Sequence, residues 1–141
     1  MFNQILVPVD LSTESTTQKL CETANDLAEK YASEVVLITV IPDYGMPLVA
    51  SFFPEDAQKK LKQEMNSKLD VLAERFFKVN VTTKLIQGKR RQVILKEIEK
   101  ISPDLVMLGC RRKKSRRDQR LLGATGTAIS DRAGCSVMVV R

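Results

Sequence analysis

The run Glu-Val-Val-Leu-Ile-Thr-Val-Ile at residues 34–41 decides how this sequence is expected to fold. It is short, almost entirely apolar and rich in β-branched side chains, and Pro42 and Asp43 end it. An unbroken apolar run of this kind is typical of a strand that is buried on both faces, as strands are inside a parallel sheet. We therefore begin from one buried strand at this position.

The segments before this run follow a strand pattern and then a helix pattern. Residues 2–9 form another short apolar run, which predicts a buried strand, and Asp10 follows it. Ser12 or Thr13 is a suitable N-cap for a helix. From there to about Ala32, apolar residues recur at every third or fourth position, which predicts an amphipathic helix.

The same alternation continues toward the C-terminus. The pattern predicts a loop at 43–54, a helix at about 55–77, a strand near a sheet edge at 79–86, a helix that ends at 101, a strand at 105–108, a helix from Gly123 to about Arg132 and a strand at 136–140. The long helix carries one apolar stripe, made of Leu61, Met65, Leu69, Leu72 and Phe76.

Five strands that alternate with four helices predict an α/β fold. Parallel strands need right-handed crossovers, so we expect a doubly wound, five-stranded parallel sheet flanked by four helices, which is a Rossmann-like architecture. The chain has 141 residues, which is the usual size of one domain with one core. We therefore expect a single domain, residues 1–141.

Histidine is absent from the sequence, and the three cysteines, Cys21, Cys110 and Cys135, lie far apart. Without histidine, the Ser/His/Asp and Cys/His nucleophile systems and the zinc sites that use histidine are excluded. Three cysteines without CxxC spacing do not make a convincing metal cage, so we assign no metal and no catalytic residue. Cys21 and Cys135 are expected in the core, and Cys110 at the end of a strand.

Two further features bear on where the protein works. No apolar stretch reaches the roughly 18 residues of a membrane span, and the first residues, 1–5, lack the basic flank of a signal peptide. An odd number of widely spaced cysteines suits a reducing compartment. We therefore expect a cytoplasmic protein that does not engage a membrane.

The formal net charge of +6 comes from one segment. Residues 111–120, Arg-Arg-Lys-Lys-Ser-Arg-Arg-Asp-Gln-Arg, hold seven of the 23 basic residues and one of the 17 acidic ones. The rest of the chain therefore carries 16 residues of each sign. The charge has to be interpreted for this basic segment alone.

Ligands of doubly wound sheets bind at the carboxyl ends of the strands, where the winding direction reverses. In this sequence, the positions at that edge are Asp10, residues 40–43, residues 87–91 and residues 109–125. Any binding site is therefore expected among them.

Five segments, several of them at this edge, resemble the universal stress protein family along essentially the whole chain. They are Ile-Leu-Val-Pro-Val-Asp at 5–10, Leu-Ile-Thr-Val-Ile-Pro at 37–42, Asp-Leu-Val-Met-Leu-Gly at 104–109, Leu-Leu-Gly at 121–123 and Cys-Ser-Val-Met-Val-Val-Arg at 135–141. The short length and the Phe-Phe-Pro loop at 52–54 are more similar to the small F/G-type branch. The resemblance implies the adenine nucleotide alpha hydrolase-like form of the doubly wound fold.

Members of this family that bind adenine nucleotides carry the motif G-x2-G-x9-G-[ST] after the fourth strand. Here Gly109 matches the first glycine, and Arg112 stands in place of the second. Ten residues instead of nine then precede Gly123, Ala124 replaces the hydroxyl residue, and Thr125 offers a hydroxyl one place later. The resemblance therefore implies a nucleotide-binding motif that is degenerate in this chain.

The candidate binding residues combine this motif with the ends of the first two strands. By resemblance, Asp10 and the backbone of Val40 would line the adenine and ribose pocket, although Asp10 could instead cap the following helix. The complete set is Pro8, Asp10, Val40, Gly109, Arg111, Arg112, Gly123, Ala124 and Thr125. The cofactor that this set implies is ATP or AMP.

The basic segment allows three interpretations. It is a solvated loop, a site for nucleotide phosphates, or a contact for nucleic acid or another acidic partner. No aromatic residue is interleaved with its cations, which argues against sequence-specific recognition of nucleic acid. We expect residues 111–120 to be the most mobile part of the chain without an anion and to become ordered with one. Lys89-Arg90-Arg91 lie at the same sheet edge and add cations there.

The sequence as a whole predicts a universal stress protein that works as a small binding or regulatory module and not as an enzyme, with slow nucleotide hydrolysis left open. We expect an adenine nucleotide or another anion at the carboxyl edge of the sheet. The alternative is a dimeric stress protein that does not bind nucleotide and acts through protein or polyanion contacts. In both cases the expected homodimer forms through the last strand, Ser136 to Val140. This strand is apolar and, by resemblance to the family, lies at a sheet edge, where it can pair with its copy.

Overall fold

The computed structural model describes residues 1–42, 54–110 and 122–141. Its elements along the chain are β1 (Gln4–Pro8), α1 (Glu14–Tyr31), β2 (Glu34–Ile41), α3 (Glu55–Phe76), β3 (Val81–Gln87), α4 (Arg90–Ile101), β4 (Leu105–Gly109), α5 (Ala124–Arg132) and β5 (Ser136–Val140). The predicted loop at 43–54, apart from Pro54, and the basic segment at 111–120 lie outside the described residues.

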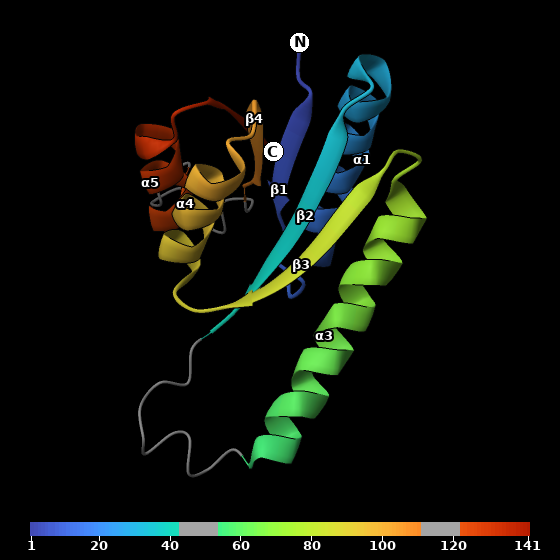
Figure 1. The fold of residues 1–141 in the computed structure, drawn as a ribbon, viewed down its shortest axis with the longest axis vertical. Helices are drawn as coiled ribbons and strands as arrows, with labels where there is room; N and C mark the ends of the chain where they lie inside the picture. The colour runs from blue at the N-terminus through green and yellow to red at the C-terminus, as the bar shows by residue number, and fades with distance from the viewer. Residues whose placement is uncertain (43–53, 111–121) are drawn as a thin grey trace, which may run out of the picture.

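The strands form one parallel sheet in the order β3-β2-β1-β4-β5, which confirms the predicted doubly wound fold. The chain winds outward from β1 through β2 to β3 and then returns to the other side of β1 with β4 and β5. Helices α1 and α3 cover one face of the sheet, and α4 and α5 cover the other (Figure 1). The winding direction reverses between β1 and β4, which are neighbours in the sheet.

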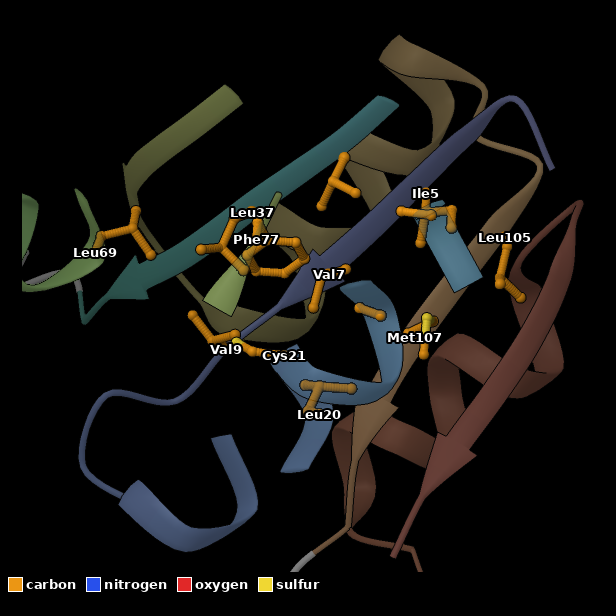
Figure 2. Packing of buried hydrophobic residues seen from close by; sticks show 13 residues of the cluster. Ile5, Val7, Val9, Leu20, Cys21, Leu37, Leu69, Phe77, Leu105 and Met107 are labelled. Atoms are coloured by element: carbon orange, nitrogen blue, oxygen red, sulfur yellow. The ribbon is translucent and has the colours of Figure 1, made fainter. Parts of the chain in front are cut away.

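The core has two halves because successive residues of a strand point to opposite faces of the sheet. On the side of α1 and α3, Val7, Leu37 and Met107 gather with Leu20 of α1 and with Phe77, which follows α3 (Figure 2). On the side of α4 and α5, the buried residues are Leu6, Val36, Ile38, Ile94, Ile98, Val106, Leu108 and Ile129. Full burial of one such side chain stabilises the folded state by roughly 1.5–3 kcal/mol relative to leaving that side chain in water.

The two edge strands differ from this pattern. β3 is partly exposed along most of its length, as predicted, because β2 is its only neighbour in the sheet. β5 forms the opposite edge, and its side chains from Val137 to Val140 are also partly exposed. Cys135, just before β5, is only partly buried, but it packs against the core on the side of α4 and α5, so the expectation that it lies in the core is confirmed in part. Burial nevertheless raises the pKa of its thiol, with a smaller contribution from the charge of Asp104.

Cys21, by contrast, is fully buried on α1, as expected. Burial, with a smaller contribution from Glu22, raises the pKa of its thiol to about 12. A thiol with this pKa stays protonated near neutral pH, so Cys21 acts as a small apolar core residue.

The apolar stripe of α3 is less buried than its spacing suggests. Leu69 is the fully buried residue of this helix, while Leu72 and Phe76 pack against the core and Leu61 and Met65 are partly exposed. The first turns of α3 extend beyond the strands that it covers (Figure 1). Among the described residues, no helix combines the length and the apolar character of a membrane span.

Candidate functional site

The candidate site begins at Asp10, which follows the end of β1 at the reversal of the sheet. The carboxylate Oδ1 accepts hydrogen bonds from the backbone N–H of Ser12 at 3.0 Å and from its hydroxyl at 2.5 Å. The hydroxyl of Thr17, in the first turn of α1, donates to the Asp10 carbonyl oxygen at 2.7 Å. These bonds fix the turn between β1 and α1, as an Asx-turn does, and they orient the carboxylate.

The second carboxylate oxygen of Asp10 faces a cation from a distant part of the chain. Arg90 Nη1 lies 3.3 Å from Asp10 Oδ2. The side chain of Arg90 is 44% exposed and that of Asp10 is 23% exposed. An ion pair with this exposure adds about 0–1 kcal/mol to the free energy of unfolding, because water and salt screen the two charges. The contact is therefore weak enough for another group to replace it.

A cleft of about 370 Å³ lies beside this ion pair, between the starts of α4 and α5. It is lined by Lys89, Arg90, Arg91, Gln92, Ala124 and Thr125; we refer to it below as the α4–α5 cleft. The first turn of each helix has backbone N–H groups that no helical carbonyl accepts, and each helix has the positive end of its dipole there. The cleft thus combines three cationic side chains with two helix starts, which is a favourable environment for an anion.

The turn from β3 into α4 places these cations. Gly88 has a φ of 150°, a conformation that residues with a side chain rarely adopt. A Cβ at this position would lie 2.7 Å from Cγ2 of Val93. The backbone N–H of Gly88 donates to the Ile41 carbonyl oxygen at 2.9 Å, which ties the turn to the end of β2. Glycine at this position therefore lets Lys89 and Arg90 begin α4 at the sheet edge.

Gly109 has a comparable role at the end of β4. A Cβ there would lie 2.8 Å from Cγ2 of Thr16, so glycine allows β4 to approach the first turn of α1. The next residue, Cys110, donates its backbone N–H to the Val140 carbonyl oxygen at 2.9 Å. The end of β4 is thereby held between α1 and β5.

The other predicted site residues occupy the same edge. Pro8 is the buried last residue of β1, and Val40 is partly buried near the end of β2. Gly123 is the N-cap of α5, and Ala124 and Thr125 line the cleft together. Arg111 and Arg112 lie outside the described residues.

Sequence reasoning did not place Arg90 in the binding set, although it noted the cations at 89–91. The structure brings Arg90 to Asp10, which is 80 residues away in sequence. The sequence held a local signal for this site: three basic residues follow Gly88 at the start of a helix. Cations at that end are unfavourable with the helix dipole, which suggests that they serve to bind an anion. Within the described ranges, no group of three or more His, Cys, Asp or Glu residues is placed to hold a metal ion.

The chain is similar in sequence to known proteins along its whole length. The sequence model of the universal stress protein family (Usp) matches residues 1–141, which is the whole sequence. The chain belongs to the universal stress protein family. Universal stress protein MJ0531 of Methanocaldococcus jannaschii is 27% identical over 150 aligned positions, which cover 100% of this chain and 83% of that protein.

Solved structures share the fold of this universal stress protein. The structure of hypothetical protein MJ0577 superposes with a TM-score of 0.77 and 22% identity, over 99% of this chain and 96% of that one. A family member from Arabidopsis thaliana with AMP bound has a TM-score of 0.60 and 19% identity, over 98% and 90% of the two chains. A universal stress protein in complex with cAMP has a TM-score of 0.64 and 14% identity, over 99% and 97%.

Proposed function

We propose that this universal stress protein is a regulatory module that binds an adenine nucleotide, or a related phosphate-bearing anion, at the carboxyl edge of its sheet. The observation that carries the proposal is the position of the Asp10 carboxylate next to the cationic α4–α5 cleft. The known complexes of other family members with AMP and cAMP give the proposal its ligand class.

The residues at the edge fit the parts of a nucleotide. The Asp10 carboxylate would accept hydrogen bonds from ribose hydroxyls, and the backbone of Val40 would lie beside the adenine. Phosphate oxygens would meet Lys89 and Arg91 together with the backbone N–H groups at the start of α5. Binding of this kind needs no catalytic residue, and we assign none.

Affinity for ATP is expected to be weak. Ala124, at the first position of α5, offers no hydroxyl to a phosphate, and Arg112 stands where the family motif has glycine. A side chain at a glycine position hinders close approach of the backbone to a phosphate. We therefore propose that the nucleotide-binding motif of this chain is degenerate. We also propose, from the short length and the Phe-Phe-Pro sequence at 52–54, that the chain belongs to the small F/G-type branch of the family.

The test is calorimetric titration of the full chain with AMP and ATP, together with mass spectrometry of any ligand released from freshly purified protein. We expect measurable AMP binding that weakens as ionic strength rises, because the cations are screened. Asp10→Asn should weaken AMP binding, whereas Asp26→Asn, at an exposed position on α1, should not change it. If neither a nucleotide nor another phosphate-bearing anion is released from the protein or binds to it, the proposal is wrong.

A second candidate function is that of a dimeric stress protein that binds no nucleotide and acts through protein or polyanion contacts. Two observations favour it: Arg90 contacts the carboxylate that a ribose would need, and β5 is an edge strand with partly exposed side chains. Pairing of β5 with its copy would cover this edge. Light scattering should then give twice the chain mass of 15.9 kDa, and Val139→Lys should shift the protein toward the monomer. Monomeric wild-type protein at micromolar concentration would contradict this candidate.

A further inference from the structure

Glu97 is the one buried charged residue among the residues that the structure describes. It is 8% exposed and lies on α4 with Val93, Ile94 and Ile98, the other buried residues of this helix. Its partner is Lys84 of β3, whose Nζ lies 3.2 Å from Glu97 Oε2. We propose that Lys84 is a regulatory modification site, at which acylation of Nζ removes this partner and loosens α4 from the edge of the sheet.

The burial of Glu97 makes the charge of Lys84 important. A carboxylate that is removed from water loses its hydration, and the attraction of a nearby cation compensates for this loss. When the cation is neutralised, the carboxylate stays buried without compensation, which destabilises a protein strongly. The exposed pair of Asp10 and Arg90 has no comparable effect, because water reaches both of its groups. The pair of Lys84 and Glu97 is therefore a sensitive point of the fold.

Lys84 is also the more accessible member of the pair. Its side chain is 30% exposed, whereas that of Glu97 is 11% exposed. β3 is an edge strand with β2 as its only neighbour in the sheet, and it lies between α3 and α4 in Figure 1. A small reagent can therefore reach Nζ from the solvent. Within the described ranges, no other lysine holds a buried carboxylate, because Glu97 is the only acidic residue that is buried there.

Acyl phosphates and acyl thioesters are the class of reagent that fits this site. The unprotonated Nζ amine attacks the acyl carbon, an amide C–N bond forms, and the bond from that carbon to the phosphate oxygen or to sulfur breaks. Phosphate or thiolate leaves, and the proton of the amine goes to the solvent. The product is a neutral amide, which lacks the positive charge that compensates Glu97. Since Glu97 lies on the inward face of α4, we expect acylation to increase local opening of this helix.

Acetyl phosphate is the probe, and hydrogen exchange of the α4 amides is the readout. The full wild-type chain and Lys84→Arg are treated alike, and peptide mass spectrometry measures acetylation of each lysine. Arginine keeps the charge and is not acylated, so the two chains differ only in the modification at this position. We expect the treated wild-type chain to exchange its α4 amides about tenfold faster than treated Lys84→Arg does. Before treatment, the two chains should exchange alike.

A second set of variants separates the charge of Lys84 from the packing of its aliphatic stem. Lys84→Gln should speed exchange of the α4 amides about as much as acetylation does, because glutamine is neutral. Adding Glu97→Gln to Lys84→Gln should restore most of the protection, since no buried charge then lacks a partner. Lys96→Gln removes an exposed charge from the same helix and should change nothing. Circular dichroism would check that each variant is folded.

The proposal is overturned if Lys84 stays unmodified while the exposed Lys96 and Lys100 are acetylated. Equal exchange in the treated wild-type chain and treated Lys84→Arg would overturn it too. If Glu97→Gln does not restore the protection that Lys84→Gln removes, the stem of the lysine matters and its charge does not, which also contradicts the proposal. None of these measurements uses a nucleotide, so their outcome is independent of the nucleotide titration.

Discussion

Two aspartates at opposite edges of the sheet have different roles. At the amino edge, where the strands begin, Asp104 Oδ2 accepts hydrogen bonds from the backbone N–H groups of Asn3 at 2.8 Å and Gln4 at 3.0 Å. At the carboxyl edge, Asp10 Oδ2 lies 3.3 Å from the guanidinium of Arg90. Asp104 thus binds two backbone groups that cannot leave, while Asp10 contacts a long side chain that can.

The direction of the chain explains the difference. Parallel strands present unpaired N–H groups at the edge where they begin, and a carboxylate there completes the hydrogen bonding of the backbone. The connecting helices run back antiparallel to the strands, so they begin near the carboxyl edge and direct their positive dipole ends toward it. The amino edge is therefore suited to stabilising the fold, and the carboxyl edge to binding an anion.

The largest expected effect tests the contrast directly. Asp104→Ala should lower the free energy of unfolding by about 2 kcal/mol, because two backbone N–H groups lose a charged acceptor, which water at this exposed position replaces only in part. Arg90→Ala should lower it by less than about 1 kcal/mol, because its ion pair is half exposed. Urea denaturation of both variants measures the difference. Equal losses would mean that the two aspartates do not differ in role, and Asp26→Ala serves as an exposed control.

A smaller effect is expected at the turn that carries the cations. Gly88→Ala should lower the free energy of unfolding by about 1–2 kcal/mol, because alanine at a φ of 150° is strained and its Cβ would clash with Val93. Gly134→Ala is a matched control, since a Cβ there meets no described atom within 4 Å. Thermal unfolding of the two variants should therefore differ clearly. A Gly88→Ala variant as stable as Gly134→Ala would show that the turn is not constrained.

The sequence predicted the fold because its signals are local. The apolar run at 34–41 coincides with β2, and the patterns around it gave the remaining strands and helices within a few residues. The edge position of β3 was predicted from its sequence pattern, whereas the degree of burial beside β5 was harder to predict, because it depends on neighbours in space. Cys135 illustrates this, since it packs against the core as expected but stays partly exposed next to the edge strand β5.

The candidate site was predictable only in part. The position of Asp10 after a buried strand was enough to place it at the carboxyl edge. Its contact with Arg90 was not predictable, because it depends on how two distant loops meet. The role of Asp104 was missed for the same reason, since the N–H groups it accepts belong to residues about 100 positions earlier. The expected ordering of residues 111–120 by an anion lies outside the described residues and stays a prediction.

The smallest expected effect concerns stabilisation of the carboxyl edge by phosphate. A ligand that binds only the folded state at a concentration equal to its dissociation constant adds about 0.4 kcal/mol. For a chain of this size, this should raise the melting temperature by about 1–2 °C. Sodium chloride at the same ionic strength should not produce the shift, because it screens the cations instead of occupying the cleft. The variant Lys89→Gln/Arg91→Gln should lose the shift, while Lys96→Gln/Lys100→Gln, with the same loss of charge elsewhere on α4, should keep it. If phosphate shifts the melting temperature of both double variants equally, the effect comes from the overall charge of the protein. Phosphate would then not bind specifically at the carboxyl edge of the sheet.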